Sequence, residues 1–380
     1  MSPVVKSGPG KRNHSTHDAG CLKPDAQPVS LSPRRPRAAI VYTDRIVRKL
    51  IWLLLLAGLA AAGWFAWALL TPVEPAGQTI VMLRPGYSTR RIAAELQSAG
   101  VIRNRQAFLL WHYLHRGRSL KAGEYLFSKP ATVIDVQNRM VRGDVYFHTL
   151  VVPEGFTIFD IARAIEAAGL GPAADFLKEA QSDTALIADI APNAPSLEGY
   201  LFPETYQFTR MMTMPEMAAA MVKQFRMQAT QMNLIADVIG RPPDYISTIV
   251  IMASIVEKET AVPEERPVVA GVYYNRLAKH VALDADPSII YAELLAGTYQ
   301  GALHHQDMQF ASAYNTYRNV GLPPGPIGNP GRTALEAAMH PAQTDYLYFV
   351  ADAQGHHRFA RTIEEHNKNV EAYRRAMRGH

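Results

Sequence analysis

An uninterrupted apolar run from residue 50 to residue 70 constrains this 380-residue chain more than any other feature of its sequence. The run reads LIWLLLLAGLAAAGWFAWALL and contains no charged residue. A helix of about 20 such residues spans the hydrocarbon core of a bilayer. The basic residues Arg45, Arg48 and Lys49 precede the run, and Glu74 follows it. By the positive-inside rule, we expect the N-terminus in the cytoplasm and the C-terminal body on the other side of the membrane.

The tail before this segment accounts for the basic character of the chain. Residues 1–49 carry ten of the 39 Lys and Arg residues but only three of the 34 acidic residues, so the rest of the chain is nearly neutral. A nearly neutral body argues against a nucleic-acid-binding protein. The tail is rich in Pro, Ser, Arg and Lys and is expected to be disordered. It also holds the single cysteine, Cys21, so the body must fold without a disulfide.

Two stretches of the body resemble each other and predict two related βα units. They are LRPGYSTRRIAAELQSAGVI at 83–102 and VPEGFTIFDIARAIEAAGL at 152–170. Each combines a strand end, a glycine with an aromatic residue, a Ser or Thr cap, a helix and a closing glycine, which is Gly100 or Gly169. The segments between them predict a helix at 107–117, a strand at 121–127 and a helix at 131–143. The result is a small β-α-α-β module.

The strongest helix signal is the apolar segment ISTIVIMASIVEKET at residues 246–260. Asp244 is expected to cap its N-terminus, and Pro263 limits how far the helix can continue. The segment has no wide polar face, so the helix should be buried on most sides. It ends in two carboxylates, Glu257 and Glu259. A glutamate among apolar neighbours at the negative end of a helix should have a raised pKa, and it could act as an acid near neutral pH.

The periodicity does not choose between Glu257 and Glu259. Two residues lie about 200° apart around a helix, so the two side chains cannot face one site. Each lies over its own apolar neighbours, and either could instead be a solvated carboxylate at the end of the helix.

The block SLEGYLFPETYQF at 196–208 places Glu198 and Glu204 among aromatic residues that include Tyr206. Carboxylates beside aromatic rings suit a sugar cleft, in which rings stack on pyranose faces and acids bind hydroxyl groups. A strand with packed aromatic residues explains the same pattern equally well. Downstream, Thr213 and Glu216 form a capping box for a further helix, which should pack near the helix at 246–260.

The last third of the chain predicts three more helices and a strand. A helix is expected at 264–280, where Asn275 and Arg276 could brace the wall of a site. Asp286 and Pro287 open another helix, and a capping role explains Asp286 better than a sugar contact. The remaining predictions are a short strand at 344–352 and an amphipathic helix at 358–377.

No motif indicates a metal or an organic cofactor. The histidine clusters His304-His305-x-Asp307 and His356-His357 lack the His-x-x-x-His spacing of a helical zinc site, and the body offers no cysteine ligand. The sequence also has no nucleophile elbow and no P-loop. We therefore expect no metal site.

Five blocks of the body occur in an order that is typical of one protein family. They are ASIVEKET at 253–260, ERPVVAGVYYNRL at 265–277, DADPSIIY at 284–291, AYNTYRNVGLPPGPIGNPG at 313–331 and YLYFVAD at 346–352. Together they resemble the YceG-like family of endolytic murein transglycosylases. The resemblance implies an α+β fold in which a membrane helix at 50–70 is followed by a linker at 71–78. A LysM-like module is then expected at 79–146, and a mostly helical catalytic domain with a small sheet at 147–380.

The resemblance also implies roles for individual residues. The second glutamate of the E-K-E-T block is catalytic in that family, which makes Glu259 the catalytic residue and Glu257 a supporting carboxylate. The Ala-Tyr-Asn element is similar to that of lysozyme-like lytic transglycosylases. Further implied roles are substrate contacts by Glu204, Tyr206, Tyr314, Asn315 and Thr316, and supporting roles for Asn275 and Asp286.

The implied reaction is cleavage of the β-1,4 bond between N-acetylmuramic acid and N-acetylglucosamine. Glu259 would protonate the glycosidic oxygen and then, as a base, assist the C6 hydroxyl to close on C1 and form a 1,6-anhydro end. This reaction requires no second carboxylate, metal or cofactor. A hydrolytic muramidase would need a second carboxylate, such as Glu204 or Glu198. A glycan-binding scaffold without catalytic activity is the third alternative.

The expected surroundings follow from the same resemblance. The substrate would be peptidoglycan glycan strands, and the protein would lie in the inner membrane with its body in the periplasm. A link to peptidoglycan synthases is expected by resemblance alone, because the sequence shows no partner surface. LysM-type modules bind glycan, but the sequence shows no glycan platform, so the module could equally be a spacer or a docking surface.

Overall fold

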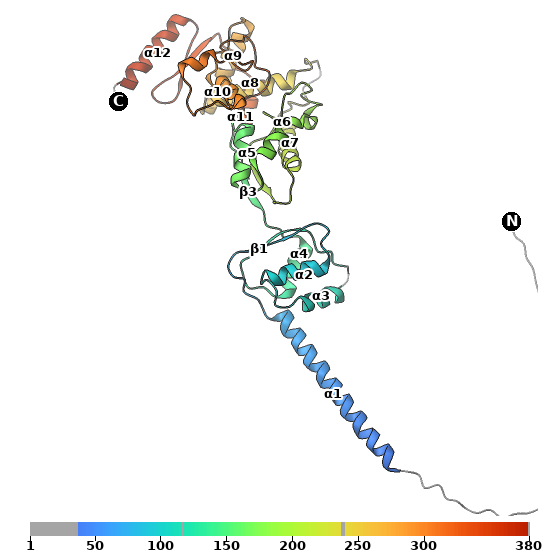
Figure 1. Ribbon diagram of the computed structural model, residues 1–380. Coiled ribbons are helices and arrows are strands. Elements are labelled where there is room, and N and C mark those ends of the chain that lie inside the picture. Colours follow the sequence, from blue (N-terminus) through green and yellow to red (C-terminus); the bar gives the residue numbers. More distant parts are fainter. Residues whose placement is uncertain (1–36, 116, 237–239, 379–380) are drawn as a thin grey trace, which may run out of the picture. The chain divides into compact units, whose positions relative to one another are not determined.

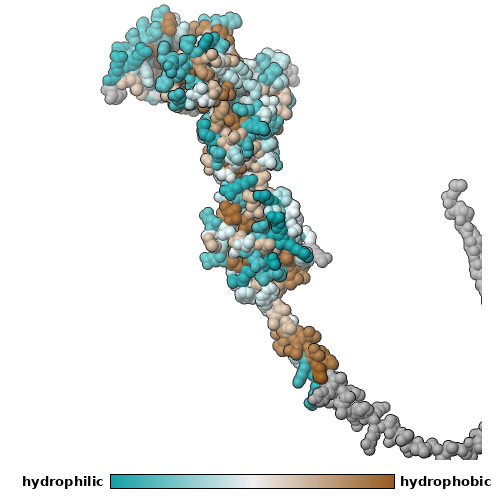
Figure 2. All heavy atoms as spheres, viewed as in Figure 1, coloured by the Kyte–Doolittle hydropathy of each residue, from teal (hydrophilic) through white to brown (hydrophobic). Residues whose placement is uncertain are grey.

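The computed structural model describes residues 37–115, 117–236 and 240–378, with side chains described from residue 44 onward. By its internal contacts the chain divides into two units after Trp64. The first helix, α1 (Arg37–Leu70), crosses this boundary. Its segment Asp44–Leu70 is long and apolar enough to span a membrane, and its exposed apolar side chains form the brown stretch of Figure 2.

The structure differs from the expectation of a disordered tail over residues 1–49. Residues 1–36 lie outside the described residues, but 37–49 belong to α1. The stretch from Ala38 to Arg48 contains several good helix formers and no glycine or proline. The apolar helix that follows provides a nucleus onto which these residues add turns.

The first module of the body follows the expected β-α-α-β order, and the helix expected at 131–143 comes after it (Figure 1). Its elements are β1 (Thr79–Leu83), α2 (Thr89–Ser98), α3 (Arg105–Leu114), β2 (Gly123–Phe127) and α4 (Val133–Arg142). The strands are antiparallel, with Thr79 opposite Phe127 and Leu83 opposite Gly123. The core includes Phe108, Tyr125 and Met140, and also Ala68 and Leu69 from the last turn of α1.

The two predicted βα units are confirmed down to their caps. Ser88 caps α2, and Thr157 forms a capping box with Asp160 at the start of α5 (Ile158–Ala167). Gly100 and Gly169 close the helices with φ angles of 69° and 67°, which only glycine adopts without a steric cost. The spacing of small and capping residues in the sequence therefore fixed these two boundaries correctly.

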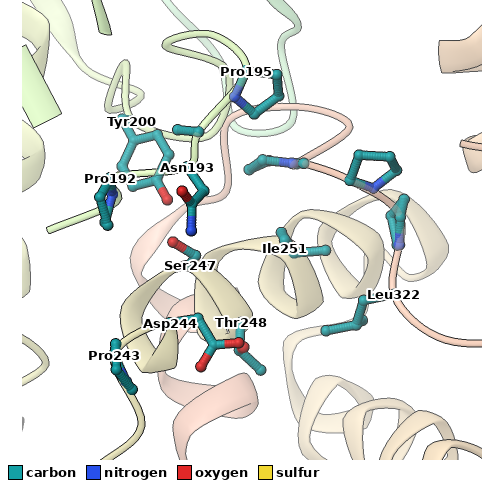
Figure 3. Close-up of a pocket in the computed structure, with 15 residues that line it drawn as sticks. Pro192, Asn193, Pro195, Tyr200, Pro243, Asp244, Ser247, Thr248, Ile251 and Leu322 are labelled. Atoms are coloured by element: carbon teal, nitrogen blue, oxygen red, sulfur yellow. The ribbon is translucent and has the colours of Figure 1, made fainter. Parts of the chain in front are cut away.

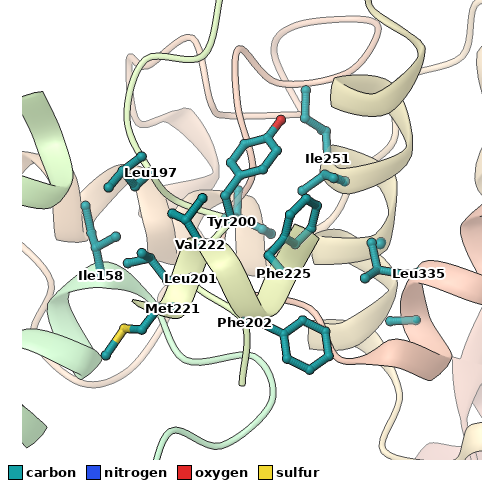
Figure 4. Close-up of a cluster of buried hydrophobic side chains, with 14 of the residues drawn as sticks. Ile158, Leu197, Tyr200, Leu201, Phe202, Met221, Val222, Phe225, Ile251 and Leu335 are labelled. Atoms are coloured by element: carbon teal, nitrogen blue, oxygen red, sulfur yellow. The ribbon is translucent and has the colours of Figure 1, made fainter. Parts of the chain in front are cut away.

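The main body begins with a two-stranded antiparallel sheet of β3 (His148–Val151) and β4 (Thr205–Phe208). Between the strands lie α5, α6 (Ala173–Ser182) and a 3-10 turn at Thr184–Ile187. Helix α7 (Met214–Gln231) follows with the predicted Thr213–Glu216 capping box. Figure 4 shows side chains of α7 beside those of the central helix, and the rings of Tyr200 and Phe225 meet edge to face at 5.2 Å.

The central helix α8 (Tyr245–Glu259) is confirmed as the core of the body. Every residue from Ile249 to Val256 is buried. Helices α9 (Arg266–Ala278), α10 (Asp286–Ala296) and α11 (Arg332–Met339) pack against it. Figure 4 shows Ile251 of α8 and Leu335 of α11 in the same cluster. Asp244 occupies the expected N-cap position, but its side chain makes no capping hydrogen bond.

The C-terminal part corrects one prediction. The helix expected at 358–377 starts only at Ile363, as α12 (Ile363–Arg378), because His357–Ala360 forms strand β6. Strand β6 pairs with β5 (Tyr348–Ala351), so the expected strand at 344–352 becomes half of an antiparallel hairpin. Pairing with β5 satisfies the backbone of residues 357–360 and buries Ala360, which outweighs their local helix propensity.

Candidate functional site

The last turn of α8 sends its two glutamates into different surroundings. The helix ends at Glu259 because Thr260 has an extended backbone, and a 3-10 turn begins at Pro263. Glu257 and Glu259 point away from each other, as their spacing predicted.

Glu257 belongs to a buried ion pair. The guanidinium of Arg266 donates to its carboxylate at 2.6 Å, and the backbone N–H of Gly331 donates at 2.9 Å. The side chains of Glu257 and Arg266 are only 5% and 6% exposed. Burial raises the pKa of Glu257, while the Gly331 hydrogen bond and the positive charge of Arg266 oppose that rise. This carboxylate ties α8 to α9 and to the start of α11.

Glu259 has a neutral partner instead. The hydroxyl of Tyr273, on α9, donates to its carboxylate at 2.7 Å. Burial raises the pKa of Glu259 to about 7; the Tyr273 hydrogen bond limits the rise and the negative charge of Asp286 adds to it. The expected raised pKa is therefore found at Glu259, and the cause is the expected one, burial. A carboxyl group in this state gives up and takes back a proton near neutral pH.

Glu259 lines a cavity of about 400 Å³. The cavity combines parts of α8, α9, the start of α10 and the segment before it, the loop after Ala313, β5 and α12. Its other lining residues are Tyr273, Arg276, Leu283, Asp284, Asp286, Tyr317, Tyr348, Phe349, Ile363 and His366. A cavity of this size accommodates a small organic ligand or part of a larger one.

Two further carboxylates share the cavity with Glu259. Asp284 is paired with the guanidinium of Arg276. Asp286 accepts a hydrogen bond of 2.6 Å from the hydroxyl of Tyr317. The predicted N-cap role of Asp286 is wrong, because Ala285 is the N-cap of α10 and Asp286 is the first residue of the helix. Its side chain points to Tyr317 rather than back to the helix backbone.

His366 places an unpartnered nitrogen at this cavity. The Nδ1 atom of His366 is buried and has no hydrogen-bond partner among the described residues. Its ring stacks on that of Tyr348 at 5.4 Å, and the guanidinium of Arg276 lies 5.6 Å from the same tyrosine ring. Burial and the positive charge of Arg276 lower the pKa of His366, so the ring is neutral near pH 7. A neutral imidazole can offer either a donor or an acceptor to a ligand.

The Ala-Tyr-Asn element lies behind the cavity rather than in its lining. Asn315 is fully buried and donates to the backbone carbonyls of Met308 and Phe310. Thr316 is also buried, and its hydroxyl forms a hydrogen bond of 2.9 Å with the hydroxyl of Ser288. Tyr314 packs on Tyr291 with ring centroids 5.1 Å apart. These contacts fix the loop that presents the next residue, Tyr317, to Asp286.

The carboxylates of the 196–208 block are also outside the cavity. Glu204 is exposed and accepts from the backbone N–H of Thr205. Tyr206 is buried and donates to the carbonyl of Phe202 at 2.5 Å. Glu198 is 1% exposed, and burial raises its pKa to about 8 despite hydrogen bonds from Ile158 and Tyr291. A packed strand, the alternative left open by the sequence, describes this block.

Asn275 braces one wall of the cavity. Its side-chain amide donates to the carbonyls of Thr344 and Tyr346, at 2.7 and 3.0 Å, just before β5. A second contact reaches the same hairpin: Glu265 accepts from His357 at 2.6 Å and from Thr260 at 3.3 Å. The hairpin that carries Tyr348 is thus tied to the residue that follows Glu259.

Sequence reasoning missed most of the cavity lining. No role was predicted for Tyr273, Tyr348, Phe349 or His366. The one signal available was the pair Tyr273 and Arg276, which a spacing of three residues places on the same side of α9. Among the residues that the structure describes, no group of three or more His, Cys, Asp or Glu side chains is arranged to hold a metal ion.

Several known proteins are similar to this chain. Residues 81–372 match the YceG-like family. A relative from Bacillus subtilis, named endolytic murein transglycosylase, is 32% identical over 324 residues, which cover 80% of this chain and 88% of that protein. A Streptococcus pneumoniae protein of the same name is 30% identical over 358 residues, 84% of this chain but 64% of that longer protein. A YceG-like protein from Listeria monocytogenes, seen in a crystal structure, shares 33% identity with a TM-score of 0.52, covering 77% of this chain and 98% of that one.

Proposed function

Because this chain belongs to the YceG-like family, we propose that it is a membrane-anchored endolytic murein transglycosylase with Glu259 as its catalytic residue. The observation that supports this role best is the state of Glu259. Its carboxyl group has a neutral hydroxyl partner and no ion pair among the described residues, and burial raises its pKa to about 7. The name of the Bacillus subtilis relative supports the substrate class, the glycan strands of murein.

In the first step, Glu259 acts as a general acid. With a pKa of about 7, close to half of the molecules hold the proton at neutral pH. The proton passes to the glycosidic oxygen of the β-1,4 bond between N-acetylmuramic acid and N-acetylglucosamine. The C1–O bond then breaks, its electron pair stays with the leaving oxygen, and C1 becomes an oxocarbenium-like centre.

In the second step, the glutamate that has lost its proton acts as a base. It accepts the proton of the muramic acid C6 hydroxyl while that oxygen bonds to C1, which gives a 1,6-anhydro end. Tyr273 donates a hydrogen bond to the carboxylate formed in the first step and stabilises it. Glu259 ends the cycle protonated, so one carboxyl group serves both steps.

The other polar groups of the cavity suit a cationic transition state. Asp286 is held by Tyr317, and it adds negative charge on the side where C1 becomes positive. Asp284 is neutralised by Arg276 and positions that arginine. The imidazole of His366 lines the cavity and would offer a ring nitrogen to a sugar hydroxyl. In this proposal Asn315 and Thr316 act indirectly, by holding the loop that carries Tyr317.

A hydrolytic muramidase is the second candidate, and Asp286 is the observation that favours it. This carboxylate shares the cavity with Glu259, and its charge raises the pKa of Glu259. It could activate a water molecule or attack C1, as the second carboxylate of a hydrolase does. Glu198 and Glu204 are poorer candidates because neither lines the cavity.

Product analysis separates these reactions. The full chain, purified in detergent, is incubated with uncrosslinked peptidoglycan strands, and the products are identified by mass spectrometry. We expect 1,6-anhydro ends from the wild type and none from Glu259→Gln, while Glu257→Gln still produces them. Reducing muramic acid ends would instead identify a hydrolase and direct attention to Asp286. Intact strands with the wild type would reject both enzymatic proposals.

The location of the protein is also a proposal. The apolar segment Asp44–Leu70 and the basic residues around Arg45 and Arg48 support a single-pass anchor with the N-terminus in the cytoplasm and the body in the periplasm. Such an anchor would hold the cavity near nascent strands. Protease treatment of intact spheroplasts tests the orientation, because only an external body would be degraded. Binding of glycan by the first module, and a link to peptidoglycan synthases, remain expectations of the family resemblance.

A further inference from the structure

A second cavity lies at the opposite end of α8 (Figure 3). It measures about 500 Å³, which is larger than the cavity of Glu259. Its lining includes Ser247 and Thr248 near the start of α8, and the proline-rich loop from Leu322 to Pro326. From Ser247 to Glu259, a helix rises about 18 Å. The two cavities are therefore distinct sites on one rigid helix.

The walls of this cavity are fixed in place. The backbone N–H of Ile327 donates to the side chain of Ser254 at 3.0 Å, which ties the proline-rich loop to α8. Gly199 packs so closely on the loop that a Cβ atom would lie 2.5 Å from Pro326. A Cβ at Gly325 would lie 2.8 Å from the hydroxyl of Tyr314. A preformed cavity of this kind loses little entropy when a ligand binds.

The polar groups in the cavity are not used by the fold. Asp244, Asn193 and Thr248 line it, and no side-chain hydrogen bond or ion pair is made by any of the three among the described residues. Asp244 leaves the N–H groups of the first turn of α8 without a side-chain cap. The site therefore offers a carboxylate for a cation and backbone N–H groups for a carbonyl or carboxylate.

The chemistry of the walls favours a peptide over a sugar. No Lys, Arg or His lines the cavity, so Asp244 is its charged group. Ile251, Leu322 and the prolines supply small apolar surfaces. The aromatic residue in the lining, Tyr200, is 1% exposed and faces Ser247 with its hydroxyl, so it offers no ring face for a pyranose (Figure 3). The matching ligand is a short peptide with small side chains and a free amino group.

We propose that this cavity binds a peptide stem of the murein strand whose glycan lies at Glu259. The proposal rests on the proposed function, because murein strands carry short peptides that contain alanine and a diamino acid. The loop that begins with Tyr317 at the catalytic cavity continues as Leu322–Pro326 at the second cavity, so the two sites share a wall. Asp244 would receive the side-chain amine of the diamino acid, and the apolar walls would receive the alanine methyl groups.

Two substrates test this proposal with the full chain in detergent. One is uncrosslinked strands that retain their peptide stems, and the other is the same strands after an amidase has removed the stems. We expect Asp244→Asn to lower kcat/KM about tenfold on stem-bearing strands and to leave cleavage of bare strands unchanged. Asp175→Asn is the matched control, since Asp175 is an exposed residue in the first turn of another helix. Equal effects of Asp244→Asn on both substrates, or none, would overturn the proposal, whereas failure of the wild type to cleave either substrate would reject the proposed function.

Direct binding provides a readout that does not depend on cleavage. The full chain with Glu259→Gln is titrated with the synthetic tetrapeptide L-Ala-γ-D-Glu-L-Lys-D-Ala and with the same peptide acetylated on the lysine amine. We expect acetylation to weaken binding about tenfold, and Asp244→Asn to remove the difference. Equal affinity of the wild-type cavity for the two peptides would contradict the role of Asp244.

Discussion

The surroundings of Glu257 and of Glu259 differ, although the two residues share the last turn of α8. Glu257 faces a guanidinium and a backbone N–H in a nearly closed interior. Glu259 faces one neutral hydroxyl and an open cavity. Both carboxyl groups lie at the negative end of the same helix and both have raised pKa values. The helix end therefore does not account for the difference between Glu257 and Glu259, whereas their hydrogen-bond and ion-pair partners do.

The comparison teaches how one helix end supports both stability and catalysis. A carboxylate matched by an arginine is committed to the folded structure, because neither charge can leave without stranding the other. A carboxyl group matched by a hydroxyl stays free to change its protonation state.

The largest effect is expected at Glu259. Glu259→Gln keeps the size of the side chain and its hydrogen bond with Tyr273, but it removes the proton that reaches the glycosidic oxygen. We expect a loss of kcat of about 1,000-fold or more, with an unchanged melting temperature. The measurement is the rate of release of new chain ends, together with thermal unfolding. Residual activity near that of the wild type would show that Glu259 is not the acid.

Glu257→Gln should instead lower the stability of the protein and leave its activity nearly unchanged. It leaves the buried Arg266 without the closer of its two anionic partners, since Glu154 lies farther away at 3.6 Å, so we expect a loss of about 3 kcal/mol in the free energy of unfolding. The activity of each folded molecule should stay within a fewfold of the wild type. Denaturant unfolding gives the first quantity and active-site titration the second. Arg332→Gln, in an exposed ion pair with Glu336, is the control and should cost less than about 1 kcal/mol. A stable but inactive Glu257→Gln variant would contradict the assignment of stability to Glu257 and catalysis to Glu259.

The pH profile tests the protonation state of Glu259. Its folded-state pKa of about 7 means that the acid form is present below this pH and is lost as the pH rises through it. We expect kcat/KM to be level below pH 7 and to fall about tenfold per unit well above it. A second fall on the acidic side would indicate a second ionised group and favour the hydrolase that uses Asp286.

Tyr273→Phe should shift the pH dependence of kcat/KM. The tyrosine hydroxyl stabilises the ionised form of Glu259 and so lowers its pKa; without it, the pKa should rise by about one unit. The descending limb of kcat/KM then moves to higher pH by the same amount. Tyr274→Phe, whose hydroxyl donates to the carbonyl of Ala338, is the matched control and should leave the limb in place. A shift of the descending limb to lower pH in Tyr273→Phe would contradict a stabilising hydrogen bond from Tyr273 to ionised Glu259.

The smallest effect is expected at His366. His366→Phe keeps a ring against Tyr348 but removes both ring nitrogens. We expect KM to rise about fivefold, with kcat little changed, because a hydrogen bond of about 1 kcal/mol to the bound sugar is lost. His340→Phe, which changes an exposed histidine outside the cavity, should change neither constant. An equal fall in kcat for His366→Phe would indicate a role in the chemical step.

The sequence predicted the local features of this fold well. Caps at Ser88, Thr157 and Thr213 and the apolar run of α8 depend on neighbours within a few residues, and all four appear in the structure. The strand at His357–Ala360 was missed because it needs β5 as a partner. Pairing across a hairpin is a tertiary effect that local propensity does not contain.

The candidate site was predictable only in part, for the same reason. Glu259 was identified by a short block and its burial by the apolar residues before it. Tyr348 and His366 reach the cavity because β5 and α12 pack there, and nothing in their own segments indicates this. Asn315 and Thr316 were expected at the substrate, yet their polar atoms are used by the loop itself. A motif marks where a site is, but only packing shows which of its atoms are free.

Asn329 has a consequence for how relatives of this chain can vary. Its buried side chain donates to the carbonyl of Phe156 and to Glu198, and it accepts from the backbone N–H of Leu201. Two segments that are distant in sequence, at 156 and at 198–201, therefore depend on one carboxamide. A change at position 329 alone would remove one donor from a buried acid, and a change at 198 alone would remove one acceptor from a buried amide. Across homologous sequences, these two positions should be replaced together or not at all.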